Sequence, residues 1–229
     1  MNHLEIINHL IKTYDFKSYL EIGVYDGNNF NGVICESKEC CDPCVCDVNV
    51  NCDVTYKMTS DEMFEQMPDD KKYDIIFIDG MHDESFVDRD IMNSLKHLNK
   101  NGVICLHDTF PPSKDAAEKF DTYTDHRGNW CGDVFKSVLK LHETNLEYHT
   151  VNNGDFGLSI IRHSDNPNAD LWELTCDYEY DNIFSSSHTT TELGKELLHE
   201  ISVEQFKEIY NPWTMATAIV GEDGITFVD

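Results

Sequence analysis

The stretch Tyr73-Asp-Ile-Ile-Phe-Ile-Asp-Gly-Met-His82 decides the fold of this chain. Its apolar run is rich in β-branched residues and does not alternate with polar ones, which is typical of a parallel strand covered on both faces. We therefore expect it in the middle of a sheet with helices on either side. In such sheets ligands bind beyond the carboxyl ends of the strands, where Asp79 and His82 stand.

Helices and strands are expected to alternate on both sides of this strand. Apolar residues at helical spacing predict helices over 3–14, from 59 through 64, over 87–98 and over 134–141. Asn101-Gly102 is expected to close the third of these. Buried strands are predicted at 17–23, 39–42, 54–58, 73–79, 103–106, 146–150 and 157–161. Asn152-Asn153-Gly154 joins the last two as an antiparallel hairpin. The predicted fold is a Rossmann-like, doubly wound α/β sheet of seven strands, mostly parallel, with helices on both faces.

The chain after this core has a different character. Residues 164–190 are polar and aperiodic, which indicates a connecting excursion, and two short helices are expected near 193–201 and 206–209. Residues 216–229 fit a terminal strand or a tail that orders against a neighbouring subunit in a homodimer. We expect a core over 1–163, beginning with an N-terminal helix over 1–15, and a C-terminal extension over 164–229 packed on it.

Composition excludes several classes of function. The 229 residues have a formal net charge of −26, from 43 acidic and 17 basic residues, which repels nucleic acids and anionic membranes. The hydrophobic fraction of 40% is that of a packed protein. Neither a spanning segment nor a signal peptide is evident, and the nine cysteines are expected to be reduced. We expect a cytoplasmic protein that binds neither nucleic acid nor membrane.

Three motifs are predicted to meet at one edge of the sheet. The first is the turn Glu21-Ile-Gly-Val-Tyr-Asp-Gly27, where glycines bring backbone close to a ligand and a carboxylate favours a cationic or zwitterionic one over a pyrophosphate. The second holds Asp79, a candidate cation ligand, and His82, a candidate general base. The alternative for His82 is a capping role at the next helix. The third motif supplies His107 and Asp108, and the alternative for the carboxylates is a bond to loop N–H groups.

Taken together, Leu20–Gly27, Tyr73–His82 and Asn101–Asp108 resemble the class I S-adenosylmethionine-dependent methyltransferases. They are most similar to a small family with an Ile-Asp-Gly-x-His element, related to sugar O-methyltransferases. Thr59-Ser-Asp-Glu-Met-Phe64 and Trp130-Cys-Gly-Asp-Val-Phe-Lys136 match the same family, and the resemblance covers residues 16–163.

The resemblance implies S-adenosylmethionine as the cofactor. It places the turn with Glu21, Gly23, Tyr25 and Gly27 around the methionine part of the cofactor, Glu21 being near its ammonium group. The residue that ends the second strand would hold the ribose hydroxyls. Further cofactor contacts are expected from Thr59, Ser60 and Asp61 at the adenine and from Asp79.

The implied activity is methyl transfer to a hydroxyl of a sugar or glycan. Asp79, His82 and Asp108 are the expected catalytic residues, with His82 as the base. Asp79, His107 and Asp108 would hold a divalent cation, Mg²⁺ or Mn²⁺, that lowers the pKa of one of two neighbouring acceptor hydroxyls. His107 departs from the family, which has Glu there, so metal-independent chemistry is an alternative. The expected acceptor contacts are Tyr123, His126 and Trp130, Trp130 having helix anchoring as its alternative.

Other functions stay open on the sequence alone. The acceptor can be a non-sugar diol such as a catechol, and a related branch of the scaffold is linked to metal-dependent hydroxylation. A cofactor-binding assembly module without turnover is the non-enzymatic alternative.

Six of the nine cysteines lie within 35–52. Cys41-Asp-Pro-Cys44 contains a Cys-x-x-Cys pair, but no second pair completes a zinc site, so zinc is the less favoured interpretation. We expect Cys40 and Cys41 to be buried strand residues and Asp42, which follows them, to be the ribose ligand. Glu36 is the alternative ribose ligand.

Overall fold

A seven-stranded sheet forms the centre of the molecule, with strand order β2-β1-β3-β4-β6-β5-β9. The structure is a computed structural model that describes residues 1–44, 49–122, 129–164, 167–186, 189–211, 217–221 and 224–228. The strands of the sheet are β1 (Ser18–Ile22), β2 (Ser37–Cys41), β3 (Tyr73–Ile78), β4 (Leu98–His107), β5 (Tyr148–Val151), β6 (Leu158–Arg162) and β9 (Glu200–Ile201). Within this sheet β6 runs antiparallel to both of its neighbours, and the other pairings are parallel. The predicted fold class is confirmed.

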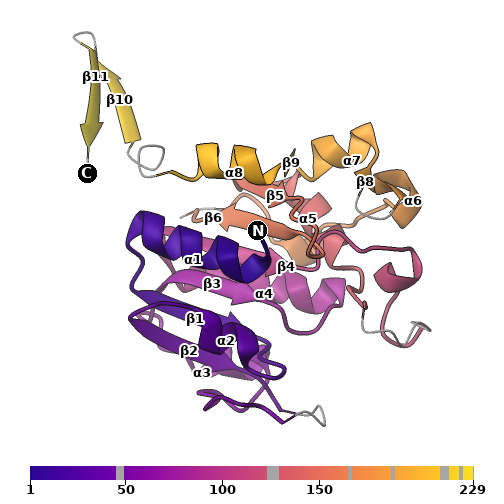
Figure 1. Ribbon diagram of the computed structural model, residues 1–229, viewed down its shortest axis with the longest axis horizontal. Coiled ribbons are helices and arrows are strands. Elements are labelled where there is room, and N and C mark those ends of the chain that lie inside the picture. The colour runs from indigo at the N-terminus through magenta and orange to yellow at the C-terminus, as the bar shows by residue number, and fades with distance from the viewer. Residues whose placement is uncertain are drawn as a thin grey trace.

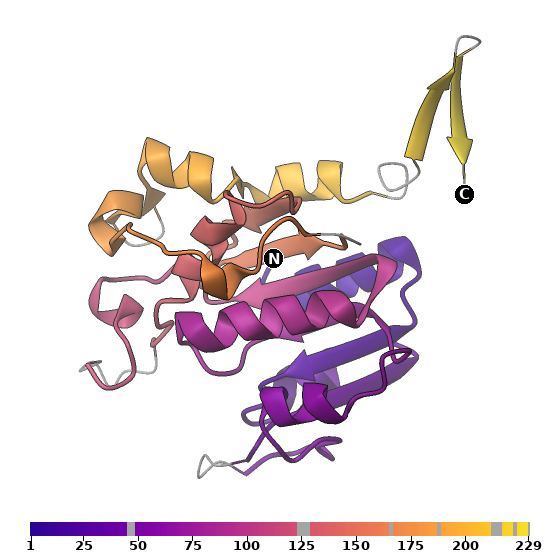
Figure 2. The ribbon, with the colours of Figure 1, turned by 180° about the vertical axis from the view of Figure 1, so that it is seen from behind.

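Helices cover both faces of this sheet, as the two views show (Figure 1, Figure 2). The helices are α1 (His3–Tyr14), α2 (Asn28–Gly32), α3 (Ser60–Gln66), α4 (Glu84–Lys96), α5 (Val134–Leu141), α6 (Tyr180–Ile183), α7 (Glu192–Leu197) and α8 (Val203–Ile209). One apolar core joins the sheet to α1, α2 and α8, and a second joins the opposite face to α3, α4 and α5.

β3 is the central strand that its sequence predicts. Ile75, Ile76, Phe77 and Ile78 are at most 1% exposed, because alternate side chains enter the two different cores. β3 pairs with β1 on one side and with β4 on the other, both in parallel. The carboxyl ends of β1, β3 and β4 therefore meet at one edge of the sheet, next to the turns that follow them.

Three sequence predictions about local structure are wrong. The helix expected near 193–201 ends at Leu197, and Glu200–Ile201 form strand β9. Residues 54–58 form no strand, and only an isolated bridge joins Tyr56 to Cys41 of β2. Asn101-Gly102 does not close a helix, because α4 ends at Lys96 and β4 already begins at Leu98. The seventh strand of the sheet is instead β9, which lies in the C-terminal extension and pairs with β5.

The remainder of the extension lies at and beyond one end of the sheet. Two short elements contribute apolar side chains to the second core, α6 and η2 (Leu171–Glu173). Two antiparallel pairs complete the chain, β7 (Phe184–Ser186) with β8 (Thr189–Thr190), and β10 (Thr217–Gly221) with β11 (Gly224–Val228). The last pair lies beyond α8 and away from the sheet (Figure 1). Within the described residues, no helix has the length and apolar character needed to cross a bilayer.

Candidate active site

The turn after β1 passes directly against the end of β3. Gly23 has φ of 84°, and a Cβ there would lie 2.1 Å from the backbone oxygen of Asp79. A side chain is therefore excluded at this position by both the backbone conformation and the available space. Gly27, with φ of 83°, is the N-cap residue of α2, and Tyr25 between the two glycines is 66% exposed. The predicted turn is thus formed next to the Asp79-Gly80 segment.

Glu21 lies buried beneath this turn with one oxygen left for a ligand. The hydroxyl of Tyr19 and Nδ2 of Asn29, the latter at 2.8 Å, both donate hydrogen bonds to Oε2. No described residue donates to Oε1. Burial raises the pKa of Glu21 to about 7, despite the two hydrogen bonds that favour the carboxylate. A cationic ligand group at Oε1 would stabilise the charged form.

Asp42 follows β2 as predicted, and its carboxylate holds the glycine turn. Oδ2 accepts hydrogen bonds from the backbone N–H groups of Val24 at 2.8 Å and Tyr25 at 3.3 Å, and Oδ1 accepts from Cys44 at 2.6 Å. Glu36 lies just before β2, at the opposite edge of the sheet, because β1 and β2 are parallel. This position separates Glu36 from the glycine turn.

The cysteine-rich segment supplies strand and loop residues. Cys40 and Cys41 are buried in β2, Cys44 is exposed, and Cys35 and Cys52 are partly buried free thiols. Cys46 lies outside the described residues. Among the residues that the structure describes, no group of potential metal ligands contains a cysteine.

The three predicted adenine-pocket residues stand together at the start of α3, each with a structural partner. Thr59 caps the helix by accepting a hydrogen bond from the N–H of Glu62. The Ser60 hydroxyl opposes the rise that burial causes in the pKa of the nearby Asp90. Asp61 accepts hydrogen bonds from Nη2 of Arg89 at 3.0 Å and from Nε at 3.1 Å, which connect α3 to α4. All three follow residues 54–58, in which Tyr56 forms a bridge with Cys41 and accepts a hydrogen bond from the backbone N–H of Asp42.

The ends of β3 and β4 bring together two carboxylates and two imidazoles. Asp79 Oδ1 lies 3.3 Å from both His82 Nε2 and His107 Nδ1. Asp108 lies 3.2 Å from His82 Nδ1 and 3.5 Å from His107 Nδ1. His82 does not cap α4, since Asp83 does so, and no described backbone N–H group bonds to Asp79 or Asp108. The four predicted residues therefore form one cluster, the strand-end cluster.

The carboxylates and imidazoles of the strand-end cluster shift one another's pKa values. Burial lowers the pKa of each imidazole, but Asp108 and Asp79 outweigh it and raise the pKa of His82 to about 9 and that of His107 to about 10. Burial likewise raises the pKa of Asp79, and the two histidines overcome this and hold it well below its usual range. The carboxylates thus favour the charged form of both imidazoles, and the imidazoles favour the charged form of Asp79.

Backbone geometry fixes the orientation of these side chains. Asp108 has φ of 61°, in the left-handed region that few residues other than glycine adopt. Gly132 has φ of 60°, and a Cβ there would lie 1.6 Å from the backbone oxygen of His82. The His82 ring stacks on Trp130 at 5.1 Å, and its Nδ1 lies 3.1 Å from the Trp130 oxygen. Trp130 is therefore a wall of the cluster, anchored by its Nε1 on the Glu118 oxygen at 2.8 Å.

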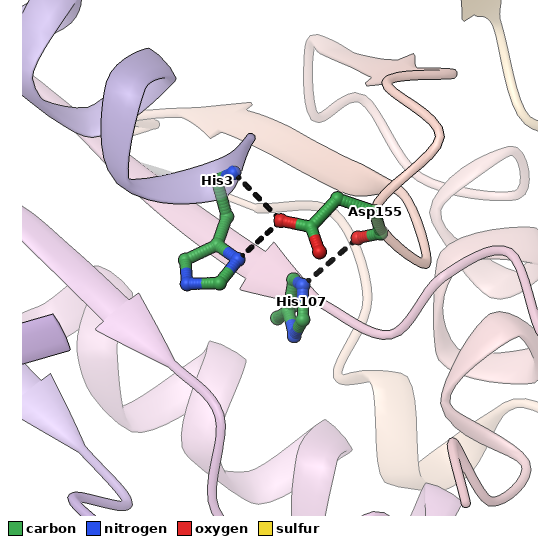
Figure 3. Close-up of side chains that lie close together, drawn as sticks. All are labelled: His3, His107 and Asp155. Carbon is green, nitrogen blue, oxygen red and sulfur yellow. Dashed lines mark hydrogen bonds and ion pairs between the residues drawn. The ribbon is translucent and has the colours of Figure 1, made fainter. Parts of the chain in front are cut away.

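Sequence reasoning missed several residues of this region. Tyr19 and Asn29, which bond to Glu21, carried a weak signal, because Tyr19 lies two residues before Glu21 on the same strand face. His3 and Asp155 adjoin His107 without any sequence signal (Figure 3). The predicted acceptor contacts Tyr123 and His126 lie outside the described residues.

Comparison with known proteins agrees with this architecture. Residues 47–109, less than a third of the chain, match the family model for a methyltransferase domain. No curated protein sequence is significantly similar to the chain. The SAH-bound methyltransferase PaMTH1 of Podospora anserina shares 14% identity over 71% of this chain and 78% of its own, with a TM-score of 0.50. The O-methyltransferase from Bacillus cereus, solved in complex with SAH, shares 13% identity over 70% of this chain and 80% of its own, with a TM-score of 0.46.

These findings bear on the fold and on the domain. The structural similarity to the fungal protein is one of fold, since its identity of 14% is low. The family match confirms the expectation of a methyltransferase domain. It covers the whole of α3, β3, α4 and β4 and the residues Asp79, His82, His107 and Asp108. The chain thus combines a methyltransferase-domain sequence over residues 47–109 with a methyltransferase-type fold.

Proposed function

We propose that the protein transfers the methyl group of S-adenosylmethionine to a hydroxyl oxygen of a sugar or glycan. The observation that carries this proposal is the contact between the glycine turn and the strand-end cluster. Gly23 of the glycine turn packs on the backbone of Asp79, which is itself a member of the strand-end cluster. A methyl donor in the turn would then lie next to the acid–base groups that act on an acceptor.

The glycine turn offers groups suited to the methyl donor. Glu21 Oε1 would bind the ammonium group of the methionine part, and Gly23, Tyr25 and Gly27 would surround it. Asp42 would hold the ribose hydroxyls beyond the backbone N–H groups that it already binds. Thr59, Ser60 and Asp61 would line the adenine. The family match and the ligand named for the fungal protein support this choice of cofactor.

Methyl transfer needs an acceptor oxygen in line with the sulfonium methyl and a group that takes the hydroxyl proton. His82 is the proposed base. An imidazolium cannot accept a proton, so His82 must first release to solvent the proton that Asp108 and Asp79 stabilise on it. The donor set of two carboxylates and two imidazoles fits a divalent cation that tolerates nitrogen ligands. Such a cation, held by Asp79 and Asp108, would lower the pKa of an acceptor hydroxyl. The structure groups these two carboxylates with His82 and not with His107, the predicted third ligand.

A hydroxylated acceptor suits the surroundings of Trp130. A cavity of about 320 Å³ lies beside Glu118, whose backbone oxygen anchors Trp130. Trp130 itself does not line this cavity, and charged side chains dominate its lining. These include Lys119, Asp133, Lys136 and Glu179. Polar walls next to an aromatic ring are typical of sites for sugars, whose hydroxyls need hydrogen-bond partners and whose ring faces are apolar.

The test is a mass-spectrometric screen for methyl transfer. Purified protein and S-adenosylmethionine are incubated with free sugars, nucleotide sugars, oligosaccharides and catechols, with and without a divalent cation. We expect a product heavier by one methyl group from a sugar-bearing acceptor, together with S-adenosylhomocysteine. A catechol as the sole acceptor would overturn the sugar part of the proposal, and cofactor binding without turnover on any acceptor would overturn the whole.

A further inference from the structure

A second group of potential metal ligands lies on the α1 side of the strand-end cluster. It consists of His3 at the start of α1, His107 at the end of β4, and Asp155 in the turn between β5 and β6 (Figure 3). Within this group, one ligand atom from each residue lies within 4.8 Å of the other two. These three residues form the His3 cluster.

The His3 cluster is held by packing as well as by hydrogen bonds. His3 Nδ1 lies 2.6 Å from Asp155 Oδ2, and the backbone N–H of His3 donates to the same oxygen at 3.0 Å. The His3 ring stacks on Phe77 and meets the His107 ring edge-on, with centroids 4.4 Å apart. His107 itself is 7% exposed. Segments more than 100 residues apart in sequence thus place their polar atoms around one point.

We propose that His3, His107 and Asp155 bind a divalent transition-metal ion of the class to which Zn²⁺ belongs. Two imidazoles and one carboxylate are a donor set that such ions favour, whereas Mg²⁺ prefers oxygen ligands alone. Three protein ligands leave positions open for water or for a ligand from solution. The net charge of −26 attracts cations to the protein in general.

The contacts of the second ring nitrogen of His107 give an independent reason to expect a metal. A histidine that binds a metal through one nitrogen almost always donates the other N–H to a carboxylate or a carbonyl, which fixes the ring and its tautomer. His107 Nδ1 lies 3.3 Å from Asp79 Oδ1 and 3.5 Å from Asp108 Oδ1. His107 Nε2, on the other side of the ring, faces the Asp155 backbone oxygen at 3.0 Å. The ring is therefore oriented for Nε2 to be the ligand.

Metal binding requires small changes in the hydrogen bonds of the His3 cluster. His107 Nε2 and His3 Nδ1 must present lone pairs, so each gives up any proton that it holds, and that proton passes to solvent. Two contacts then open to admit the ion, that of His3 Nδ1 with the Asp155 carboxylate and that of His107 Nε2 with the Asp155 backbone oxygen. This site is separate from the Asp79 and Asp108 carboxylates, and its existence does not depend on the proposed methyl transfer.

Cobalt provides a spectroscopic probe of this site in the full-length chain, prepared without a polyhistidine tag. Co²⁺ is titrated into the metal-free protein, and its visible d–d bands report the ligand field. We expect one Co²⁺ per chain bound at this site, with no near-ultraviolet charge-transfer band from a thiolate. His3→Ala and Asp155→Asn should each weaken this binding by at least about tenfold, since even residues that only support a ligand have effects of that size.

His9→Ala is the matched control, because His9 lies on the same helix but contacts the Tyr210 oxygen and the Phe206 ring. It should bind Co²⁺ like the wild type. Equal affinity in the wild type and His3→Ala, or a thiolate band, would overturn the proposal.

X-ray absorption at the zinc edge of the wild-type protein gives a test that does not depend on variant folding. Imidazole scattering without sulfur is expected, and a sulfur shell would contradict the site. If no ion binds while methyl transfer proceeds, the His3 cluster is only a latch between α1 and the β5–β6 turn, and the proposed function stands.

Discussion

The two halves of the same sheet edge use carboxylates in different ways. Beyond β2 and at the start of α3, Asp42 holds backbone N–H groups and Asp61 holds Arg89. Beyond β3 and β4, Asp79 and Asp108 pair with the imidazoles of His82 and His107, and His82 also stacks on Trp130. The carboxylates of the first half bind structural groups, whereas the second half brings two carboxylates and two imidazoles into mutual contact.

The position of a carboxylate at this edge therefore does not by itself reveal its role. Carboxylates stand after the strands in both halves, as the topology of an open α/β sheet predicts for ligand-binding residues. Only the second half concentrates shifted pKa values in one cluster, which is typical of functional sites. Substitutions in the second half should therefore change the reaction, and substitutions in the first half should change binding or stability.

The largest effect is expected for His82→Gln. Loss of the proposed base should lower the turnover rate by about 10²- to 10⁴-fold, the usual contribution of general acid–base catalysis. Methyl transfer to the best acceptor of the screen is the measurement, with circular dichroism as the check on folding. His9→Gln, in α1, should leave the rate unchanged. A His82→Gln rate within twofold of the wild type would refute the base assignment.

The second-largest effect is expected in the stability of the cofactor-free protein, which depends on the protonation of Glu21. Its pKa of about 7 in the folded state lies above the ordinary value of 4.5, so the wild type loses stability as pH rises through this interval. At pH 8 the cost is roughly 3 kcal/mol, which Glu21→Gln should remove while keeping an oxygen for Tyr19 and Asn29. Urea unfolding at pH 5 and pH 8 measures the difference. Parallel pH dependence in both proteins would contradict it.

Asp42→Ala should have a smaller effect, on cofactor affinity. Three backbone N–H groups lose their acceptor, so the glycine turn loosens and the proposed ribose ligand disappears. We expect S-adenosylmethionine to bind about tenfold more weakly, which corresponds to about 1.4 kcal/mol. Asp69→Ala, at an exposed position before β3, is the control. Unchanged affinity in Asp42→Ala would remove Asp42 from the cofactor site.

The smallest effect is expected at the ion pair of Asp61 and Arg89. Both side chains are partly exposed, at 40% and 36%, so loss of the pair should cost less than about 1 kcal/mol of stability. Asp61→Ala and Arg89→Ala should be equally stable, but only Asp61→Ala should also weaken cofactor binding, by about threefold. Equal affinities in the two variants would mean that Asp61 has no contact with the adenine.

Much of the fold could be predicted from local sequence. The run in β3 and the capping box at Thr59 carry their own signals, because burial on two faces and helix capping constrain residue type directly. Residues 54–58 have the composition of a strand but make only one bridge. β9 has two residues in the sheet, which is too short for any periodicity.

The site likewise contains residues that the sequence predicts and residues that it does not. Asp79, His82, His107 and Asp108 follow two strands that are adjacent and parallel, so the topology places them together. His3 and Asp155 approach His107 from a helix start and a hairpin turn, and that approach depends on how α1 packs on the sheet. Such tertiary placement leaves no local pattern to detect.

The central claim is that the edge around Gly23 binds S-adenosylmethionine through Glu21. Calorimetric titration of the cofactor at pH 8 into the wild type, Glu21→Gln and Glu36→Gln tests it most directly. Glu36 is the matched control, because it lies before β2 at the opposite edge of the sheet. We expect one site per chain in the wild type, binding weakened by at least about tenfold in Glu21→Gln, and wild-type affinity in Glu36→Gln. Absence of binding to the wild type, or equal affinity in the wild type and Glu21→Gln, would contradict it.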